Sequence, residues 1–261
     1  MLIKSHHFFI LSENPWPLYS SLGSFNAFLS FLIFLKSQEF LIFFLRIILL
    51  CVISFYWWFS YGNEFNLEGL ESQRLRYGLK FRIILFIRSE VFFFFSFFWS
   101  YFHFFLSPSM ETGMVWPFSL IEIFDFSRVP LVNTLLLLTS GLTVTIRHHL
   151  IDLQNYKFSQ AFLALTVFLG FLFSTLQVIE YNRAFFRIRD GTFGTCFFVL
   201  TGFHGLHVLI GSIYLCFSLF RMRGMVSMSN DYASFEIRSW YWHFVDVVWL
   251  FLFFFLYYLN W

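Results

Sequence analysis

One imidazole and one carboxylate lie three residues apart in an apolar run near the end of the chain. His243 and Asp246 belong to the segment Trp-Tyr-Trp-His-Phe-Val-Asp-Val-Val-Trp, residues 240–249. An ionisable group in hydrocarbon costs several kcal/mol unless it finds a partner. Residues at i and i+3 share one helical face, so these two side chains can join each other or one neighbouring helix. The pattern therefore allows two interpretations, a catalytic pair or a polar lock between helices.

Two further imidazoles, His204 and His207, share a helical face in Thr-Gly-Phe-His-Gly-Leu-His, residues 201–207. Histidines at this spacing can belong to a metal ligand set. The glycines at 202, 205 and 211 favour a different role, because glycine lets a second helix approach and the histidines could then hydrogen-bond across that contact. Nor do two segments carry histidines at the spacing that stacked haems require. The sequence therefore predicts no metal ligand, no cofactor ligand and no catalytic residue.

Glu90 stands alone in the apolar run Ser-Glu-Val-Phe-Phe-Phe-Phe. Its neighbours at i±3 and i±4 on a helix are all apolar: Phe86, Ile87, Phe93 and Phe94. Arg88 lies on roughly the opposite face, which makes it a poor partner. Three roles stay open: an acid in a proton relay, a contact to a lipid headgroup, or a protonated side chain bonded to a neighbouring helix.

The remaining polar groups lie toward segment ends. Adjacent histidines point about 100° apart on a helix, so His148 and His149 cannot act as one face, and we expect them to cap the last carbonyls. His103 is expected to be a satisfied interfacial side chain. Glu180 is expected at headgroup level, where a charge costs little.

The elements that must position these groups are membrane helices. The 261 residues are 59% hydrophobic and only 12% charged, whereas soluble domains carry about 25% charged residues. A membrane-crossing helix needs about 20 mostly apolar residues. We predict an all-α polytopic membrane protein forming a single transmembrane domain, with seven spans at about 20–36, 40–60, 81–106, 129–150, 158–182, 192–220 and 235–260.

Lysine and arginine set the expected orientation. With the N-terminus inside, the inner loops and span ends hold ten of these residues, including Arg147, and the outer ones hold five, which favours that orientation.

We expect residues 61–80 to form a solvated loop at the headgroup boundary. Residues 107–128 contain Pro108, Gly113 and Pro117 and are expected to form an ordered cap without a helix.

Several motifs, in order and at matching spacing, carry a resemblance to a known family. They include residues 14–18, Tyr56-Trp57-Trp58, Ser89-Glu90-Val91, Val129 to Thr134, Thr201 to Val208, and Trp240 to Leu252. Together they cover nearly the whole chain, which resembles subunit III of the aa3-type cytochrome c oxidases, above all the mitochondrial kind.

The resemblance implies a bundle split by a lipid-filled cleft into a two-helix and a five-helix group. It implies that haem and copper belong to partner subunits of an oxidase that passes electrons from cytochrome c to oxygen and pumps protons. This chain would stabilise subunit I, contact subunit II and small accessory subunits, and support proton uptake or oxygen access. It could also join a respiratory supercomplex. The implied location is the mitochondrial inner membrane with the N-terminus on the matrix side, and no nucleic acid is involved.

The resemblance also sorts the polar residues into two groups. The first group contains the candidates for the lipid cleft and other polar positions inside the membrane, which would contact bound phosphatidylethanolamine, phosphatidylglycerol or cardiolipin. These residues are Glu90, Trp57, Trp58, Glu64, Lys80, Arg82 and His103. The helices would be locked together by a second set: His148, His149, Glu180, His204, His207, Glu236, His243 and Asp246.

The chain departs from the family pattern at residues 59–63, 69–71 and 80–82. These family positions face headgroups, so the phosphate contacts there are in question. Arg88 stands where the family is usually apolar, and we expect it to turn outward toward a lipid phosphate or an accessory subunit. Two other functions are alternatives: an autonomous proton or ion transporter using Glu90, His204, His207 and Asp246, and a haem-bearing cytochrome, which would need ligand pairs that the sequence lacks.

Overall fold

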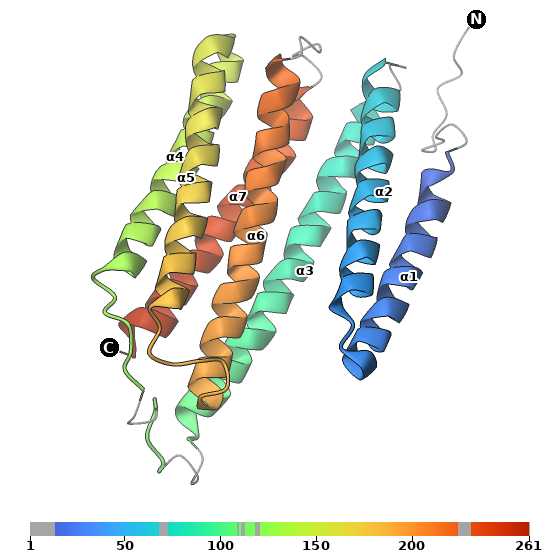
Figure 1. Cartoon of the computed structure of the whole chain (residues 1–261). Coiled ribbons are helices and arrows are strands. Elements are labelled where there is room, and N and C mark those ends of the chain that lie inside the picture. Colours follow the sequence, from blue (N-terminus) through green and yellow to red (C-terminus); the bar gives the residue numbers. More distant parts are fainter. Residues whose placement is uncertain are drawn as a thin grey trace, which may run out of the picture. The chain divides into compact units, whose positions relative to one another are not determined.

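A computed structural model describes residues 14–67, 73–108, 110, 113–117, 121–223 and 231–260, with the backbone alone at 61–67, 73–76, 221–223 and 231–234. Within these ranges the chain forms seven α-helices, and the predicted all-α class is confirmed (Figure 1). The helices are α1 (Trp16–Ser37), α2 (Phe40–Leu67), α3 (Gln73–Leu106), α4 (Val129–Asp152), α5 (Tyr156–Asn182), α6 (Gly191–Arg223) and α7 (Asp231–Leu252), and α7 continues as the π-helix η2 (Phe253–Tyr258).

Six of these helices are long and apolar enough to cross a membrane. Helix α3 has the length, with 34 residues, but it does not reach that apolar level among the described residues. Its polar side chains explain the difference, because Glu90 and His103 both interrupt the phenylalanine-rich second half. The third predicted span is thus a helix, but one less apolar than the other six.

The predicted solvated loop at residues 61–80 is wrong for most of its length. Helix α2 continues to Leu67 and α3 begins at Gln73. The segment holds no proline, so nothing in it forbids helical backbone. Residues 69–71 lie outside the described part of the chain. By contrast, the described residues between Ser107 and Arg128 form turns, bends and irregular backbone with no α-helix, as predicted.

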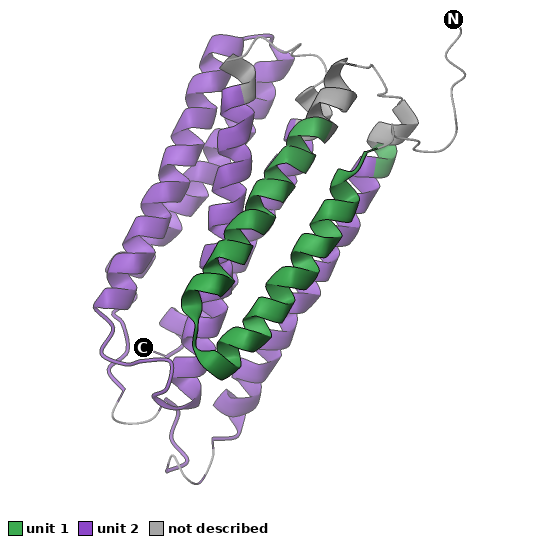
Figure 2. Ribbon diagram, turned by 45° about the vertical axis from the view of Figure 1, so that its right-hand side comes forward, with its two compact units in different colours: residues 1–78 green, residues 79–261 purple. Residues whose placement is uncertain are grey.

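The chain divides into two compact units, residues 1–78 and 79–261 (Figure 2). The first contains α1 and α2, and the second contains most of α3 together with α4 to α7. The predicted grouping of two helices and five helices is confirmed. The phospholipid expected with this grouping remains a prediction.

Helices α1 and α2 form an antiparallel pair joined by a tight turn. Gln38 adopts a left-handed conformation with φ of 59°, and its N–H donates to the carbonyl of Phe34. Arg46, a cation inside the predicted second span, donates from Nη1 to the backbone carbonyl of Asn26 on α1 at 3.3 Å. The guanidinium thereby has a polar partner on the neighbouring helix, as a charged side chain within a membrane span requires.

In the second unit, α4 packs against α5 and α7, and α6 packs against the same two helices. These four helices therefore form a closed ring, and side chains of α7 fill the space between them. Trp242 is fully buried, and its Nε1 donates to Ser140 Oγ on α4 at 2.9 Å. A Cβ atom added at Gly170 of α5 or Gly211 of α6 would lie 2.7 or 2.9 Å from the Trp242 indole. One side chain of α7 thus contacts all three other helices.

Trp249 repeats this arrangement two helical turns later. Its Nε1 donates to Thr134 Oγ1 on α4 at 3.0 Å. Its ring centroid lies 4.8 Å from that of Phe173 on α5 and 5.1 Å from that of His204 on α6. A seven-residue separation keeps both indoles on one face of α7. The four helices therefore pack around two layers of side chains, each with one tryptophan at its centre.

Aromatic side chains join α3 to this ring. Phe93 lies 5.0 Å from Phe203 of α6, and Phe94 lies 6.2 Å from Phe244 of α7, between ring centroids. Phenylalanine fills more space than leucine, so these contacts bridge a separation at which the helix backbones do not meet closely. The many phenylalanines of α3 therefore have a packing role.

The turn before α4 is organised by one carboxylate. Asp125 accepts hydrogen bonds from the Ser127 hydroxyl at 2.6 Å, the Ser127 N–H at 3.0 Å and Arg128 Nε at 3.1 Å. The bonds from Ser127, with a smaller contribution from Arg128, hold the pKa of the Asp125 carboxyl below its usual range. Proline at the second helical position then starts α4 with its φ already set.

The glycine prediction for α6 is partly wrong. Added Cβ atoms at Gly202 and Gly205 would meet nothing within 4 Å, whereas one at Gly211 would collide with Trp242. The close approach therefore occurs at Gly211 and at Gly170 of α5, where the tryptophan inserts. Spacing along α6 could not identify these positions, because the side chain that needs the space comes from α7.

We expect Gly170→Ala to destabilise the protein by about 1–3 kcal/mol, the usual cost of overpacking, since its methyl group would overlap the Trp242 indole and Ser212 Oγ. Gly202→Ala is the matched control and should be neutral or stabilising by up to about 1 kcal/mol through helix propensity. Thermal unfolding of the purified protein in detergent compares the two variants. Equal stability of both would contradict the proposed tryptophan packing.

Candidate functional site

Glu90 of α3 and His207 of α6 form a polar pair inside the helical bundle. Glu90 Oε2 lies 3.0 Å from His207 Nε2, and both side chains are mostly buried. The other ring nitrogen, His207 Nδ1, lies 2.6 Å from the carbonyl of Phe203. A carbonyl oxygen only accepts, so Nδ1 carries a proton. Of the three roles left open for Glu90, this geometry matches a bond to a neighbouring helix.

The Phe203 contact limits the protonation states of the pair. If His207 is neutral, Nε2 is an acceptor, and Glu90 must donate its own proton to form the bond. If His207 is cationic, Nε2 donates to an ionised Glu90. Both arrangements are neutral overall and share one proton, so the pair avoids an uncompensated charge among apolar side chains.

His204 faces a different helix from His207. Its Nε2 lies 3.2 Å from the carbonyl of Val245 on α7, and the side chain is buried. Because the carbonyl accepts, Nε2 carries a proton. The buried Nδ1 has no hydrogen-bond partner among the described residues, so a second proton there would leave an uncompensated charge, and the ring is neutral at this contact. The two histidines share a face of α6, but each serves a separate interface.

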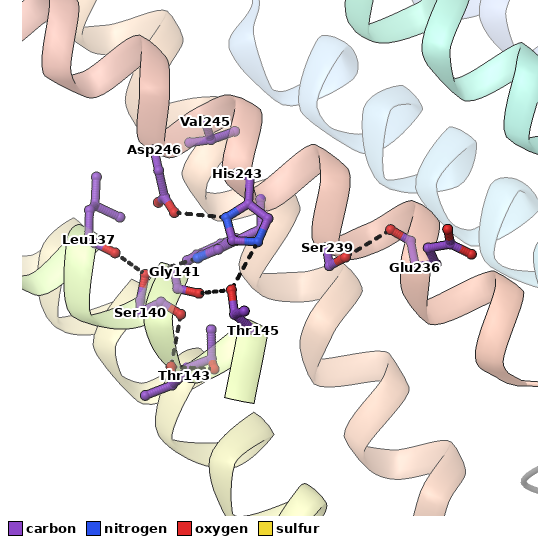
Figure 3. A network of polar contacts seen from close by, with 12 residues as sticks. Leu137, Ser140, Gly141, Thr143, Thr145, Glu236, Ser239, His243, Val245 and Asp246 are labelled. Atoms are coloured by element: carbon purple, nitrogen blue, oxygen red, sulfur yellow. Dashed lines mark hydrogen bonds and ion pairs between the residues drawn. The ribbon is translucent and has the colours of Figure 1, made fainter. Parts of the chain in front are cut away.

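His243 and Asp246 lie against α4 (Figure 3). Asp246 Oδ2 lies 3.8 Å from His243 Nδ1, and His243 Nε2 lies 3.5 Å from Thr145 Oγ1. A Cβ atom at Gly141 would lie only 2.5 Å from Asp246 Oδ2. Glycine at this position therefore lets the carboxylate of α7 rest on the backbone of α4. This is the geometry expected of a polar lock between two helices.

Hydroxyl groups extend this lock across the ring. Ser140 Oγ accepts from Trp242 and donates to the carbonyl of Leu137 at 2.7 Å. Thr143 Oγ1 lies 2.8 Å from Thr166 Oγ1 of α5. These contacts connect α7 to α4 and α4 to α5 at one level of the bundle (Figure 3).

Charged side chains gather where α3 and α7 begin and α6 ends. Lys80 forms an ion pair with Glu236, and its Nζ lies 6.0 Å from the Trp240 ring. Arg238 donates to Ser218 Oγ of α6. Two of the predicted residues, Lys80 and Glu236, are thus brought together although they were expected to serve lipid binding and helix locking separately.

Two residues predicted at the level of the membrane surface are buried inside the protein. Only 2% of the surface of Glu180 is exposed, so side chains of neighbouring elements surround it. Arg147, expected at the inner surface, is also 2% exposed, and its guanidinium lies 3.4 Å from the centroid of the Phe235 ring. Glu180 belongs to the last turn of α5 and Arg147 to the turn before the last of α4. The sequence suggests exposure near helix ends, but other elements pack against both residues.

Backbone N–H groups already bind the carbonyls that His148 and His149 were predicted to cap at the end of α4. The carbonyls of His149, Leu150 and Ile151 already accept backbone N–H groups from Leu153, Asn155 and Gln154. The ring of His148 instead lies 6.2 Å from the ring of Phe235 on α7.

The remaining lipid candidates lie mostly on the surface of their helices. Trp58, Arg82 and His103 are exposed, and Trp57 is half-buried. Arg88 is exposed as expected, with its guanidinium carbon 5.9 Å from the Phe92 ring centroid. Glu64 lies in the part of α2 whose side chains are not described.

Sequence reasoning missed the residues that hold the site together. Trp242 and Trp249 contact all three partner helices, and Tyr257 packs beside Glu180. The seven-residue spacing of the two tryptophans, together with small residues on other helices, was an available signal. Across the described ranges, no group of three His, Cys, Asp or Glu side chains is arranged to hold a metal ion.

A protein-family model and curated proteins both assign the chain to the same family. The family model described as cytochrome c oxidase subunit III matches residues 6–261. The curated protein named cytochrome c oxidase subunit 3 from Rhipicephalus sanguineus is 44% identical over 252 residues, covering 97% of this chain and 98% of the relative. The protein of the same name from Aedes aegypti is 44% identical over 249 residues, covering 95% of each chain. The protein of the same name from Chondrus crispus is 40% identical over 255 residues, covering 96% of this chain and 93% of the relative.

We expect Glu90 and His207 to be energetically coupled. Glu90→Leu and His207→Leu should each destabilise the protein, because each leaves a polar partner unpaired, and the double variant should cost about 1 kcal/mol less than their sum. Thermal unfolding of the single and double variants in detergent measures this coupling. The control combines Glu90→Leu with His103→Leu, farther along the same helix, and should be additive. Additive behaviour of the Glu90 and His207 variants would contradict the pair.

Proposed function

Because the chain belongs to the cytochrome c oxidase subunit III family, we propose that it is the third core subunit of an oxidase that passes electrons from cytochrome c to oxygen and pumps protons. In this proposal the haem and copper centres belong to partner subunits, and this chain stabilises subunit I. Subunit II, small accessory subunits and a respiratory supercomplex are the further proposed partners.

The observation that carries this proposal is how the buried ionisable groups are used. Glu90 contacts α6, His204 contacts the backbone of α7, and Asp246 rests on α4. A relay through these groups would need them to pass protons from one to the next. Each is instead engaged at its own helix–helix interface, which favours a supporting subunit over an autonomous transporter.

Phospholipid binding is the second proposed role. Exposed aromatic and cationic side chains at membrane depth or at its boundary suit an acyl chain and a phosphate, respectively. Trp58, Arg82 and Arg88 have this character and this exposure. Phosphatidylethanolamine, phosphatidylglycerol and cardiolipin all present the phosphate that such a site requires. Lys80 is already paired with Glu236, so it is a weaker phosphate ligand than the sequence suggested.

We place the protein in the mitochondrial inner membrane with its N-terminus in the matrix. The excess of lysine and arginine in the loops on that side supports this orientation. From there the subunit would support proton uptake or oxygen access by subunit I, with Glu90 and His207 as the polar pair closest to such a role.

Purification of the native protein tests the proposal. We expect the chain to co-migrate on a native gel with a complex that shows haem absorption and oxidises reduced cytochrome c. Migration alone, or with a complex lacking haem, would contradict it and would support an autonomous transporter. Haem bands in the isolated chain would contradict the assignment of redox centres to other subunits.

We expect Glu90→Gln to leave electron transfer nearly intact, because the amide keeps the shape and the hydrogen bond to His207 while the proposed redox centres lie elsewhere. Oxygen consumption by the assembled complex with reduced cytochrome c measures this. Ser96→Ala, an exposed position on the same helix, is the control. Loss of most turnover in Glu90→Gln with normal assembly would contradict a supporting role.

A further inference from the structure

A second polar cluster lies away from the pairs described above. It consists of Asn133 on α4, Gln177 and Glu180 on α5, and Tyr257 on η2. Their exposed fractions are 0%, 4%, 2% and 0%. Asn133 Nδ2 donates to Gln177 Oε1 at 3.3 Å, and the Tyr257 hydroxyl faces both Gln177 and Glu180. Three structural elements therefore bring four uncharged or acidic side chains into one buried place.

Five polar atoms of this cluster form no hydrogen bond of normal geometry with the described residues: Asn133 Oδ1, Gln177 Nε2, Glu180 Oε1, Glu180 Oε2 and the Tyr257 hydroxyl. The Tyr257 hydroxyl approaches Glu180 and Gln177, and Tyr181 approaches Gln177, closely enough to interact, but these contacts are not well-aligned hydrogen bonds. Buried polar groups in native proteins nearly always have a partner, because leaving one unpaired forfeits its hydration. One such atom could reflect a local packing defect, but here five of them lie on four adjacent side chains. They indicate that a small polar ligand binds between these side chains.

The mixture of donors and acceptors identifies the class of ligand. A cation would suit the Glu180 oxygens but would be repelled by the N–H groups of Gln177. An anion would be repelled by Glu180 itself. Exchanging oxygen and nitrogen in both amides does not change this, because the pair still leaves one carbonyl oxygen and one NH₂ group unpaired. Water both donates and accepts, and it can serve all five atoms.

The π-helix explains how Tyr257 reaches the cluster. Leu259 N–H donates to the carbonyl of Phe254, five residues earlier, at 3.0 Å. The wider turn shifts the register of the side chains beyond it. Tyr257 is thereby turned inward beside Glu180, while Asn260 donates to the Tyr101 hydroxyl of α3 at 2.8 Å. A regular continuation of α7 would present a different residue to the cluster.

The cluster also lies close to the ends of its helices. Glu180 is in the last turn of α5, which ends at Asn182, and Asn133 is near the start of α4 at Val129. Water therefore has about one helical turn to pass from the connecting segments to the site. We propose that Asn133, Gln177, Glu180 and Tyr257 form a buried hydration site, in which ordered water bridges the carboxyl group, the two amides and the phenol.

A high-resolution cryo-EM map of the native complex tests this directly. We expect at least one density peak at hydrogen-bond distance, about 2.7–3.2 Å, from Glu180 and from Tyr257 or Gln177. Direct hydrogen bonds that satisfy all four side chains without such a peak would overturn the proposal. A peak bound by oxygen atoms alone, with short contacts typical of a metal ion, would also overturn it.

Variants of the cluster and of a neighbouring tyrosine test whether the water depends on the cluster residues. Tyr257→Phe removes one hydroxyl, and the adjacent water peak should disappear, with a lower melting temperature of the complex. Tyr258→Phe is the matched control, because the neighbouring tyrosine is 53% exposed, and it should change neither. If Tyr257→Phe prevents assembly, Glu180→Gln replaces it, since the amide keeps a donor and an acceptor and should retain the water. An unchanged water peak in Tyr257→Phe, or a lost one in Glu180→Gln, would overturn the proposal.

Discussion

The insertion of Trp242 between three other helices is the constraint on which the second unit depends. Its indole occupies the space left by Gly170 and Gly211 and donates to Ser140. With no hydrophobic effect to bring helices together in lipid, close packing and interhelical hydrogen bonds must do so. Trp242 provides both at once, and Trp249 repeats the arrangement one layer away. The positions of α4 to α7, and therefore of every polar pair they carry, follow from these two residues.

Several polar contacts of this unit are neutral overall. Glu90 and His207 share a proton between α3 and α6, while Lys80 compensates Glu236. His204 meets a backbone carbonyl as a neutral ring. A charge left uncompensated among apolar side chains would cost more than these contacts return. Glu180 lies beside the Tyr257 hydroxyl but forms no well-aligned hydrogen bond with the described residues, and for its carboxyl group we infer water.

Prediction from the sequence succeeded where a signal is carried by one segment alone. Helix positions follow from the length of apolar runs, and the locations of α4 to α6 were predicted to within a few residues. It failed where a second segment decides the outcome. Gly202 and Gly205 have the spacing of a helix contact, yet in the described part of the chain no atom lies within 4 Å of a Cβ added at either position. Glu180 and Arg147 lie near helix ends, yet both are buried because other elements pack against them.

By itself the sequence determined the all-α class, the number of helices, the family and the identity of the buried polar residues. These depend on composition, local periodicity and motif order, all of which are properties of contiguous residues. Only the tertiary structure decided which partner each polar residue meets: Glu90 with His207, Asp246 with the backbone at Gly141, and Glu180 with Tyr257. The reason is that a helical face fixes only the direction in which a side chain points. The group that it reaches is set by the register of a different helix, and here that register is set by two tryptophans and a π-helical turn.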